Sequence, residues 1–457
     1  MAELPDIETL DDAASLEHYG RDWTRFWPAA PSAVVFPRST DDVVDLVRWA
    51  RTSGRALVPS GGRTGLSGGA VARAGEVVVS LEKMRRVIDF EASEPSVTVE
   101  AGLPVGDLQR LAAERGYCYP VDWSAAGSSQ VGGSIATNAG GIRVLRYGMT
   151  RDWVRGLKVV TGTGEVLELN RGLIKNNTGL DLRQLMIGSE GVLGIVTEAT
   201  MALAPPPCEQ SVLLLAFSDL AAIMPSFQQL RTALTLSAFE FFDRRSIGHV
   251  AEATGSEFPL DPDGTFYAIV EFDDPDQANQ EKALGVFETL LEQGRVSDGT
   301  ISQSGSQATE LWQWREAISE SIAPSTPYKN DLAVRVARVP DFLRDLDQLV
   351  ARHYPDFEVV WFGHIGDGNL HMNVLKPEHW SVEDFHLAGK RLSPRVFELV
   401  QRYSGSVSAE HGVGLLKCDD LEWTRSAEEI ALMRAIKRQF DPDGILNPGK
   451  IFSVDAG

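Results

Sequence analysis

Two glycine-rich segments in the first third of the chain constrain its fold more than any other feature. The first, residues 59–69 (PSGGRTGLSGG), follows an apolar run at residues 56–58 that predicts a strand. The next apolar run, at residues 77–79, predicts another strand, so no helix follows the glycines. A Rossmann fold places a helix N-terminus directly after its glycines, and this order therefore argues against one. Glycines let the backbone approach an anion closely, and consecutive free N–H groups can bind a phosphate.

The second segment, residues 126–141 (AGSSQVGGSIATNAGG), holds five glycines and five Ser, Thr or Asn residues. Two such loops in one domain could hold the two ends of one large, phosphate-bearing cofactor. Each loop alone is equally compatible with a flexible surface loop. A third glycine set lies at residues 187–196, whereas residues 161–164 (TGTG) lie between apolar runs and predict a hairpin turn.

Strand and helix signals alternate along most of the chain after an irregular lead-in at residues 1–30. Ser39 and Asp42 predict a helix start after a strand at residues 34–36, and Gly54 predicts the helix end. This order indicates an α/β or α+β domain. The run of three prolines at residues 205–207 is the clearest linker signal, and the chain beyond it, to about residue 410, predicts an antiparallel sheet with helices. The elements predicted there are strands at 212–217 and 266–272, helices at 280–293 and 341–353, and a tail helix at 427–440.

Composition excludes several classes of protein. Lys and Arg number 43 against 64 Asp and Glu, and the net charge of −21 argues against binding nucleic acid or an anionic membrane. Three widely spaced cysteines exclude a disulfide scaffold and a Cys-rich zinc module. The acidic start is unlike a targeting peptide, and the apolar runs are too short to span a bilayer, so we expect a cytoplasmic protein.

The most informative stretch for chemistry is residues 359–374 (VVWFGHIGDGNLHMNV), where Asp367-Gly368 predicts a two-residue hairpin turn. With that turn, residues whose numbers sum to 735 face each other, and His364 lies directly opposite His371. Their Cβ atoms would then lie ~4.5–5.5 Å apart on one face, with Asn373 two residues along. Two imidazoles at this spacing can share a metal ion, although two half-buried histidines without a ligand give the same pattern.

Other polar residues could complete such a site. Residues 408–414 (SAEHGVG) supply Glu410 and His411, and a His₂Glu set with an open position is a catalytic arrangement; an exposed polar pair at a turn is the alternative. Arg315 and Ser319 are four residues apart on a predicted helix, and Lys329 adjoins a predicted strand. Arg and Lys together suit a substrate carboxylate, although each alone is more typical of a solvated charge.

Taken together, these motifs resemble the FAD-linked oxidases of the vanillyl-alcohol-oxidase superfamily, which share the PCMH-type flavin fold. Within this superfamily the chain is similar to the D-2-hydroxyacid dehydrogenases over about residues 30–455. Residues 175–181 and the loop with Gln130 resemble the hydroxyglutarate branch of these dehydrogenases more than the other branches. The strings that carry the resemblance are PSGGRTGLSGG, GSSQVGGSIATNAGG, NNTGLDLRQLMIGSEGVLGIVTE, GHIGDGNLHMNV, SAEHGVG and ILNPGK.

The resemblance implies an α+β fold with a lead-in at residues 1–30, an FAD domain at 31–207, a substrate domain at 208–420 and a C-terminal segment at 421–457 that returns to the FAD domain. The first loop would wrap the pyrophosphate, the second would run along the flavin, and Glu190 and Ile195 would lie near the adenine. Neither glycine loop contains a histidine, so we expect non-covalent FAD. The implied FAD contacts are Pro59, Ser60, Gly61, Gly62, Arg63, Thr64, Gly65, Ser67, Asp122, Gly127, Ser128, Gln130, Gly132, Gly133, Thr137, Asn138, Gly140, Gly141, Glu190, Gly191, Gly194, Ile195, Val196 and Asn447.

The resemblance also implies roles for the polar residues. A divalent metal, expected to be zinc, would be bound by His364, His371 and Glu410, and His411 would be the catalytic base. Substrate contacts would come from Arg315, Ser319, Lys329, Asn373 and His411. The implied reaction is oxidation of D-2-hydroxyglutarate, with D-malate a further candidate, and the implied electron acceptor is an electron-transferring flavoprotein or a quinone. A homodimer is compatible with this assignment.

Three alternatives differ in what they predict. A D-lactate dehydrogenase or a glycolate oxidase subunit of the same fold would prefer a monoacid. A flavin-free metal hydrolase would be colourless and would leave the glycine loops unexplained. A non-catalytic electron-transfer or assembly subunit would bind FAD but would be indifferent to a chelator.

Overall fold

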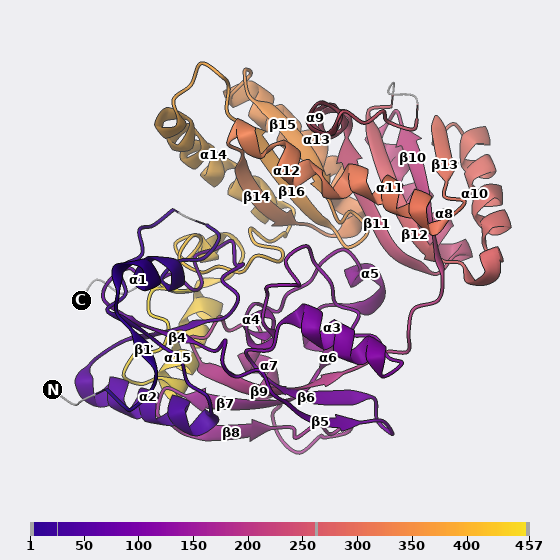
Figure 1. The fold of residues 1–457 in the computed structure, drawn as a ribbon. Helices are drawn as coiled ribbons and strands as arrows, with labels where there is room; N and C mark the ends of the chain where they lie inside the picture. The colour runs from indigo at the N-terminus through magenta and orange to yellow at the C-terminus, as the bar shows by residue number, and fades with distance from the viewer. Residues whose placement is uncertain (1–3, 25, 261–263, 454–457) are drawn as a thin grey trace. The chain divides into compact units, whose positions relative to one another are not determined.

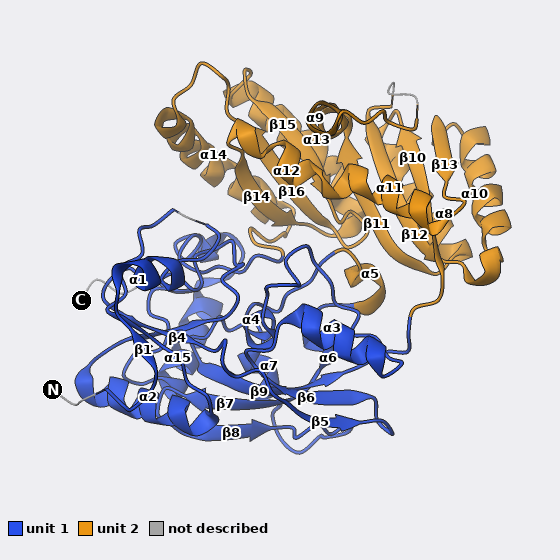
Figure 2. Ribbon diagram, viewed as in Figure 1, with its two compact units in different colours: residues 1–141, 148–206, 410–457 blue, residues 142–147, 207–409 orange. Residues whose placement is uncertain are grey.

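The computed structural model describes residues 4–24, 26–260 and 264–453. The chain divides into two compact units (Figure 2): residues 1–141, 148–206 and 410–457 form unit 1, and residues 142–147 and 207–409 form unit 2. Unit 2 begins next to the boundary predicted at residue 207, but it ends at residue 409, earlier than the predicted 420. Residues 142–147, predicted in the FAD domain, belong to unit 2 because α5 (Val144–Tyr147) packs on its strand β11 (Leu236–Asp243).

A four-stranded sheet forms one part of unit 1 (Figure 1), in the order β1-β2-β4-β3. Strands β2, β4 and β3 are parallel, and β1 is antiparallel to β2. Helix α2 (Thr40–Ser53) starts where the Ser39 side chain accepts a hydrogen bond from Asp42 N, and it ends at Gly54 in the left-handed conformation. The predicted helix and both of its ends are therefore confirmed. The strands are β1 (Thr9–Leu10), β2 (Ala33–Val35), β3 (Leu57–Ser60) and β4 (Val77–Ser80).

A five-stranded antiparallel sheet forms the other part of unit 1, in the order β5-β6-β9-β7-β8. One apolar cluster joins residues of both sheets. The turn between β7 and β8 contains Gly164 at φ +80°, which confirms the predicted hairpin at residues 161–164. The strands are β5 (Val87–Glu91), β6 (Ser96–Glu100), β7 (Val154–Thr161), β8 (Val166–Leu169) and β9 (Gly194–Ala202), and the helices of unit 1 besides α2 include α1 (Ala13–Tyr19), α3 (Val105–Glu114), α4 (Val131–Thr137), α6 (Thr150–Trp153), α7 (Arg183–Met186) and α15 (Ala427–Phe440).

Unit 2 is built on a seven-stranded antiparallel sheet in the order β13-β10-β12-β11-β15-β16-β14, as predicted for this half of the chain. Helices α9 and α11 cover the face that carries Phe242, Val360 and Phe362, and these side chains form one core cluster. The strands besides β11 are β10 (Gln210–Phe217), β12 (Phe266–Asp273), β13 (Asp298–Ile301), β14 (Tyr328–Ala333), β15 (Glu358–Gly363) and β16 (Asn369–Leu375). The helices besides α5 include α8 (Ile223–Ala233), α9 (Arg244–Thr254), α10 (Gln280–Glu292), α11 (Gly305–Glu316), α12 (Ile318–Ser321), α13 (Val339–His353) and α14 (Val382–Arg402).

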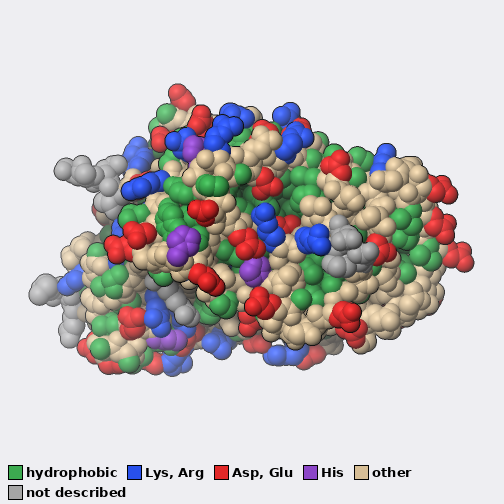
Figure 3. Space-filling model, turned by 90° about the horizontal axis from the view of Figure 1, so that it is seen from above, with side chains coloured by type: hydrophobic (Ala, Val, Ile, Leu, Met, Phe, Trp, Pro, Cys, Tyr) green, Lys and Arg blue, Asp and Glu red, His purple; other side chains and the backbone are tan. Residues whose placement is uncertain are grey.

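Two structural observations concern nucleic acid and membranes, the partners that the composition argues against. Acidic and basic side chains are interspersed over the described residues of the face drawn in Figure 3. In the part of the chain that the structure describes, every helix is too short or too polar to cross a bilayer.

Candidate functional site

The two glycine-rich segments of unit 1 lie against each other. A Cβ added at Gly62 would lie 2.0 Å from the Ser128 carbonyl oxygen, so only glycine permits this approach. The hydroxyls of Thr64 and Ser129 are 2.8 Å apart and join the two segments by a hydrogen bond. The structure therefore brings together the two loops that the sequence predicts to hold one cofactor.

Polar atoms at this meeting point lack partners. Ser60 Oγ, Gln130 Oε1 and Asn447 Oδ1 are buried and have no hydrogen-bond partner among the described residues. A Cβ added at Gly127 or at Gly133 would meet no atom within 4 Å, so the backbone there faces open space. Two unpaired acceptors and an unpaired hydroxyl suit a ligand that carries N–H and O–H donors, as the flavin ring and the ribityl chain of FAD do.

The second glycine-rich segment is not the continuous loop that we predicted. Residues 131–137 form helix α4, and Asn138 follows in the left-handed conformation at φ +51°. Val131 and Ile135 are buried, and Gly132 packs against Ala101, where a Cβ would lie 2.7 Å from the Ala101 methyl group. Apolar residues at i and i+4 were the sequence signal for this short helix, and the glycines between them obscured it.

The turn that carries His411 is bound tightly by other residues of unit 1. The Glu190 carboxylate accepts hydrogen bonds from Val413 N and Gly414 N, both at 2.7 Å, and burial raises its pKa. Ser67 Oγ lies 2.5 Å from His411 O and 3.1 Å from Gly412 O and can donate to either. These contacts explain why the chain after residue 409 packs with unit 1. Glu190 and Ser67, which the resemblance implies as FAD contacts, hold the segment with the implied base.

The other implied FAD contacts have various environments. The Arg63 guanidinium lies 4.5 Å from the centre of the Tyr19 ring and 3.1 Å from His18 Nε2, so α1 in the predicted lead-in holds it. Asn447 Nδ2 donates to Gly69 O at 3.0 Å and to Glu190 O at 2.7 Å. The remaining contacts lie as follows: Pro59 against Gly191, Gly61 against Gln130, Asp122 O against Gly141, Thr137 donating to Gly133 O, Asn138 accepting from Arg151 N, and Gly194, Ile195 and Val196 buried in β9. Gly65 and Gly140 lie within the two glycine-rich segments.

One face of the unit 2 sheet carries most of the remaining implied residues. Strand β14 pairs with β16 so that Lys329 lies opposite Asn373 and Asp331 opposite His371. Because side chains alternate along a strand, these four project from the same face. Lys329 is exposed on β14, the edge strand of the sheet, and Asn373 is buried on β16.

The predicted register of the histidine hairpin is wrong. His371 lies opposite Phe362, and residues whose numbers sum to 733 pair, because the turn is longer than two residues. The His364 carbonyl accepts hydrogen bonds from the N–H groups of Asp367, Gly368 and Asn369, so His364 belongs to the turn. A shift of two residues keeps every side chain on its predicted face. The two imidazoles still approach each other, with ring centroids 5.3 Å apart and planes at 85°.

Buried carboxylates lie behind both histidines. Glu240 Oε1 on β11 is 2.8 Å from His364 Nδ1, and Asp331 Oδ1 is 3.7 Å from His371 Nδ1. A metal-binding histidine typically gives its other ring N–H to a carboxylate or a carbonyl. The surroundings of this pair therefore fit a divalent metal such as zinc, bound through the remaining ring nitrogens. The sequence reasoning missed Glu240, whose signal was a lone acidic residue within an apolar strand run.

Arg315 and Ser319 differ in their surroundings. The Arg315 guanidinium is buried on α11, forms an ion pair with Glu240 Oε2 at 2.8 Å and lies 4.7 Å from the centre of the Phe362 ring. Its Nε has no acceptor among the described residues. The predicted single helix ends at Glu316, and Ser319 lies exposed on the short helix α12.

Glu410 and His411 directly follow the last residue of unit 2. Ala409 N donates to Asp331 Oδ2 at 3.0 Å, so the sheet that carries His371 fixes the chain where it leaves the unit. Glu410 is the next residue, and its Cα lies ~3.8 Å from that of Ala409. Glu410 Oε1 lies 3.5 Å from His411 Nε2.

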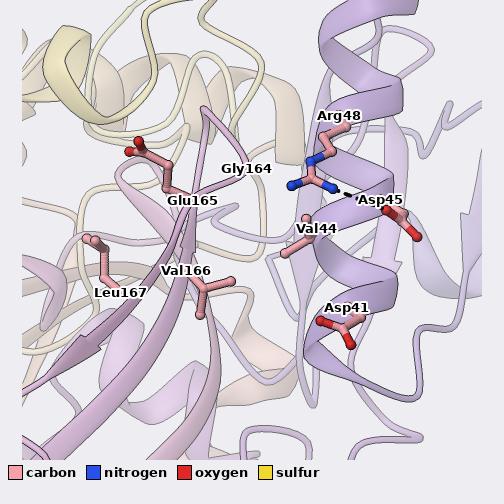
Figure 4. A pocket seen from close by; sticks show the side chains of 8 residues that line it. All are labelled: Asp41, Val44, Asp45, Arg48, Gly164, Glu165, Val166 and Leu167. Atoms are coloured by element: carbon pink, nitrogen blue, oxygen red, sulfur yellow. Dashed lines mark ion pairs between the residues drawn. The ribbon is translucent and has the colours of Figure 1, made fainter.

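A separate hollow of unit 1 does not suit an anionic cofactor. It has a volume of about 790 Å³ and lies between α2 and the start of β8 (Figure 4). Asp41, Asp45 and Glu165 line it with Arg48, which is 3.8 Å from Asp45. Three carboxylates against one paired cation would repel a diphosphate.

Two family models match successive parts of the chain. Residues 31–170 match the model of an FAD binding domain, and residues 206–451 match the model of the C-terminal domain of FAD linked oxidases. The second match covers more than half of the chain.

Two bacterial relatives match nearly the whole chain. A protein from Xanthomonas citri pv. viticola named D-2-hydroxyglutarate dehydrogenase is 53% identical over 99% of this chain and 95% of its own length. A protein of the same name from Stutzerimonas stutzeri is 52% identical over 98% of this chain and 96% of its own length.

Solved structures share the fold at low identity. The structure of p-cresol methylhydroxylase with substrate bound matches with a TM-score of 0.76 at 16% identity, over 98% of this chain and 95% of that chain. A structure of alkyldihydroxyacetonephosphate synthase matches with a TM-score of 0.73 at 20% identity, over 98% of this chain and 84% of that chain. The expected α+β PCMH-type fold is thereby confirmed.

Proposed function

Because this chain belongs to the FAD-linked oxidases and is an FAD-dependent oxidoreductase, we propose that it oxidises D-2-hydroxyglutarate to the 2-oxo acid. The observation that carries the proposal is the unit 2 sheet face, where two imidazoles 5.3 Å apart share a surface with Lys329 and Asn373. A 2-hydroxy acid offers its hydroxyl and one carboxylate oxygen as chelating donors. The names of the two bacterial relatives support the same substrate.

The proposed metal site comprises His364, His371 and Glu410. Two neutral imidazoles and one carboxylate leave a zinc ion open to substrate, as catalytic zinc sites require. When bound, FAD supplies the two-electron acceptor and the metal supplies the Lewis acid at the 2-hydroxyl. Support for the metal comes from the two imidazoles, the carboxylates behind them and the chain connection from Asp331 through Ala409 to Glu410.

The protein's own residues would bind and orient the substrate. Arg315 and Lys329 would hold the distal carboxylate, since a site built to pair a charge disfavours a substrate that lacks it. Asn373 would contact the substrate through its side-chain amide, whose Nδ2 donates to Val360 O and His371 O. His411 would accept the hydroxyl proton on a ring nitrogen, with Ser67 bound to its carbonyl oxygen and Glu190 bound to the N–H groups of Val413 and Gly414 in the same turn.

A monoacid such as D-lactate or glycolate is the second candidate substrate class. The Arg315–Glu240 ion pair favours it, because this pair neutralises one of the two cations that a distal carboxylate would need. D-malate has a distal carboxylate like D-2-hydroxyglutarate, but it is a shorter diacid. A substrate panel separates the candidates: a kcat/KM for D-lactate above that for D-2-hydroxyglutarate would reject the distal-carboxylate role of Arg315 and Lys329.

The electron acceptor, assembly and compartment belong to the proposal as well. An electron-transferring flavoprotein or a quinone as acceptor is supported by the family resemblance, and a homodimer is compatible with it. We place the enzyme in the cytoplasm, on the two bacterial relatives. Reduction by substrate, followed by stopped-flow reoxidation with each acceptor, would test the first of these.

The decisive experiment is an anaerobic visible spectrum before and after D-2-hydroxyglutarate is added, with and without a chelator. Bleaching of the flavin band that the chelator abolishes would support the substrate and the metal together. A flavin band that D-2-hydroxyglutarate leaves unchanged would reject the substrate. In the same assay, His411→Ala should slow bleaching by ~10²–10⁴-fold with unchanged flavin content, and loss of flavin in this variant would reject its role as base.

A further inference from the structure

Glu240 lies in the middle of β11, all eight residues of which are buried. Its side chain is 1% exposed. A carboxylate at such a position is strongly destabilising unless charged or hydrogen-bonding partners surround it. The identity of its partners therefore indicates why it is there.

Each carboxylate oxygen of Glu240 has a different partner. Oε1 lies 2.8 Å from His364 Nδ1, and Oε2 lies 2.8 Å from a terminal nitrogen of Arg315. One partner is a proposed metal ligand, and the other is a proposed anchor for the substrate's carboxylate. Glu240 itself would contact neither the metal nor the substrate, but only these two residues.

We propose that Glu240 is a positioning residue that orients the His364 ring and the Arg315 guanidinium together. By accepting the Nδ1–H of His364 it leaves Nε2 as the ring nitrogen that can bind a metal. Its charge also holds the Arg315 guanidinium through the ion pair at 2.8 Å, in which neither Glu240 Oε2 nor Arg315 Nε makes a hydrogen bond among the described residues. This inference rests on the proposed function and names a residue that acts on both halves of the substrate.

The role requires a carboxylate rather than an amide. Both oxygens of a carboxylate accept hydrogen bonds, whereas the amide of Gln accepts at one end and donates at the other. Glu240→Gln can therefore satisfy His364 or Arg315 but not both. The change removes little volume, so it separates this role from simple packing.

The second histidine is positioned differently. Asp331 Oδ1 lies 3.7 Å from His371 Nδ1, beyond hydrogen-bond distance, while the Asp331 carboxylate accepts from Asn369 Nδ2 at 2.8 Å and Ala409 N at 3.0 Å. His371 itself lies within strand β16, opposite Phe362. His364 lies in the turn, where no strand ladder holds it, so Glu240 should matter more for metal binding than Asp331.

The test uses the full-length flavoprotein, stripped of metal and titrated with Zn²⁺ against a coloured chelator. We expect Glu240→Gln to weaken Zn²⁺ binding by about 10–100-fold, to raise KM for D-2-hydroxyglutarate and to leave flavin content unchanged. The matched control is Glu271→Gln on the neighbouring strand β12. Glu271 is 4% exposed and binds Ser237, Trp312 and Arg143, away from His364, so Zn²⁺ affinity should not change.

The outcomes separate this inference from the proposed function. Wild-type protein that binds no Zn²⁺ would overturn the proposed metal site, and this inference with it. Wild-type binding together with unchanged affinity in Glu240→Gln, or an equal loss in Glu271→Gln, would overturn the inference alone. If Glu240→Gln does not fold because Arg315 is left unpaired, the double variant E240Q/R315M removes that charge. It should fold and still bind Zn²⁺ more weakly, and wild-type affinity in it would overturn the inference.

Discussion

Lys450 is a buried cation whose replacement should stabilise unit 1. The side chain is 1% exposed, and its Nζ has no acceptor among the described residues. Burial lowers the pKa of its ammonium group to about 8 from the usual 10.5, although the carboxylates of Glu76 and Asp22 partly offset this. Lys450→Met keeps the unbranched shape and removes the charge.

The magnitude follows from the two pKa values. A difference between 10.5 and about 8 corresponds to about 3 kcal/mol at 1.36 kcal/mol per pKa unit. Between these pH values the unfolded chain binds more protons than the folded one, so for this group the free energy of unfolding rises with pH. The full penalty is present below pH 8. Lys450→Met should therefore gain about 3 kcal/mol at pH 7, and the gain should shrink toward zero near pH 10.5.

The assay is thermal unfolding of the holoprotein followed by release of flavin fluorescence, which reports the FAD-binding domain. For a domain of this size 1 kcal/mol shifts Tm by about 2–4 °C, so we expect an increase of about 6–12 °C at pH 7. Lys437→Met is the matched control in the same tail segment. Lys437 Nζ donates to the carbonyls of Val192 and Leu446, both at 3.0 Å, and its loss should lower Tm.

Two results would refute the reasoning about Lys450. A gain of the same size at pH 7 and pH 10 would show that the charge is not its source. A loss of stability at pH 7 that is absent in the apoprotein would show that the ammonium group binds the cofactor and is paired in the holoprotein.

Three further predictions concern the glycine loops and one buried acid. Gly62→Ala, which brings a Cβ against Ser128 O, should destabilise unit 1 by about 1–3 kcal/mol and deplete flavin absorbance; wild-type flavin content would contradict it. Gly133→Ala, which fills open space beside helix α4, should weaken FAD binding without lowering apoprotein Tm, because Ala favours a helix more than Gly does; unchanged FAD affinity would place the cofactor elsewhere. Asp243 caps α9 through Ser246 N, and burial raises its pKa to about 6 from 3.8, so stability falls as pH rises through that interval. Asp243→Asn keeps the cap and should gain about 3 kcal/mol at pH 7 but nothing at pH 3, by Tm against pH; a gain at both would refute it.

Elements with complete local signals were predictable. The tail helix was predicted at its observed bounds, Ala427–Phe440, and the structure shows a capping box of Ser426 and Glu429 at its start. The hairpin register was not predictable from local signals, because the turn depends on contacts distant in sequence. Gly366 N donates to Phe239 O on β11 at 3.0 Å and holds the longer turn. The Asp-Gly signal located the turn but not its length.

The chemistry of the candidate site was predictable where residues cluster in sequence and not where they meet only in space. His364 and His371 share one hairpin, and their approach followed from strand alternation despite the wrong register. Glu240 lies more than a hundred residues away on another strand, and nothing local relates it to either partner. A lone acid in a buried strand signals that a partner exists, but only the fold identifies it.

The partners of the buried polar groups distinguish structural residues from those of a ligand site. The Glu271 carboxylate is satisfied by Ser237, Trp312 and Arg143, as expected of a group that only holds the fold together. Where the chain has been built around a ligand, some polar atoms have no protein partner, since the ligand supplies it. Arg315 Nε on the unit 2 face and Gln130 Oε1 between the glycine segments have no hydrogen-bond partner among the described residues, as this second kind requires. An unpaired buried atom destabilises the empty protein, so its retention is explained if the bound ligand pairs with it.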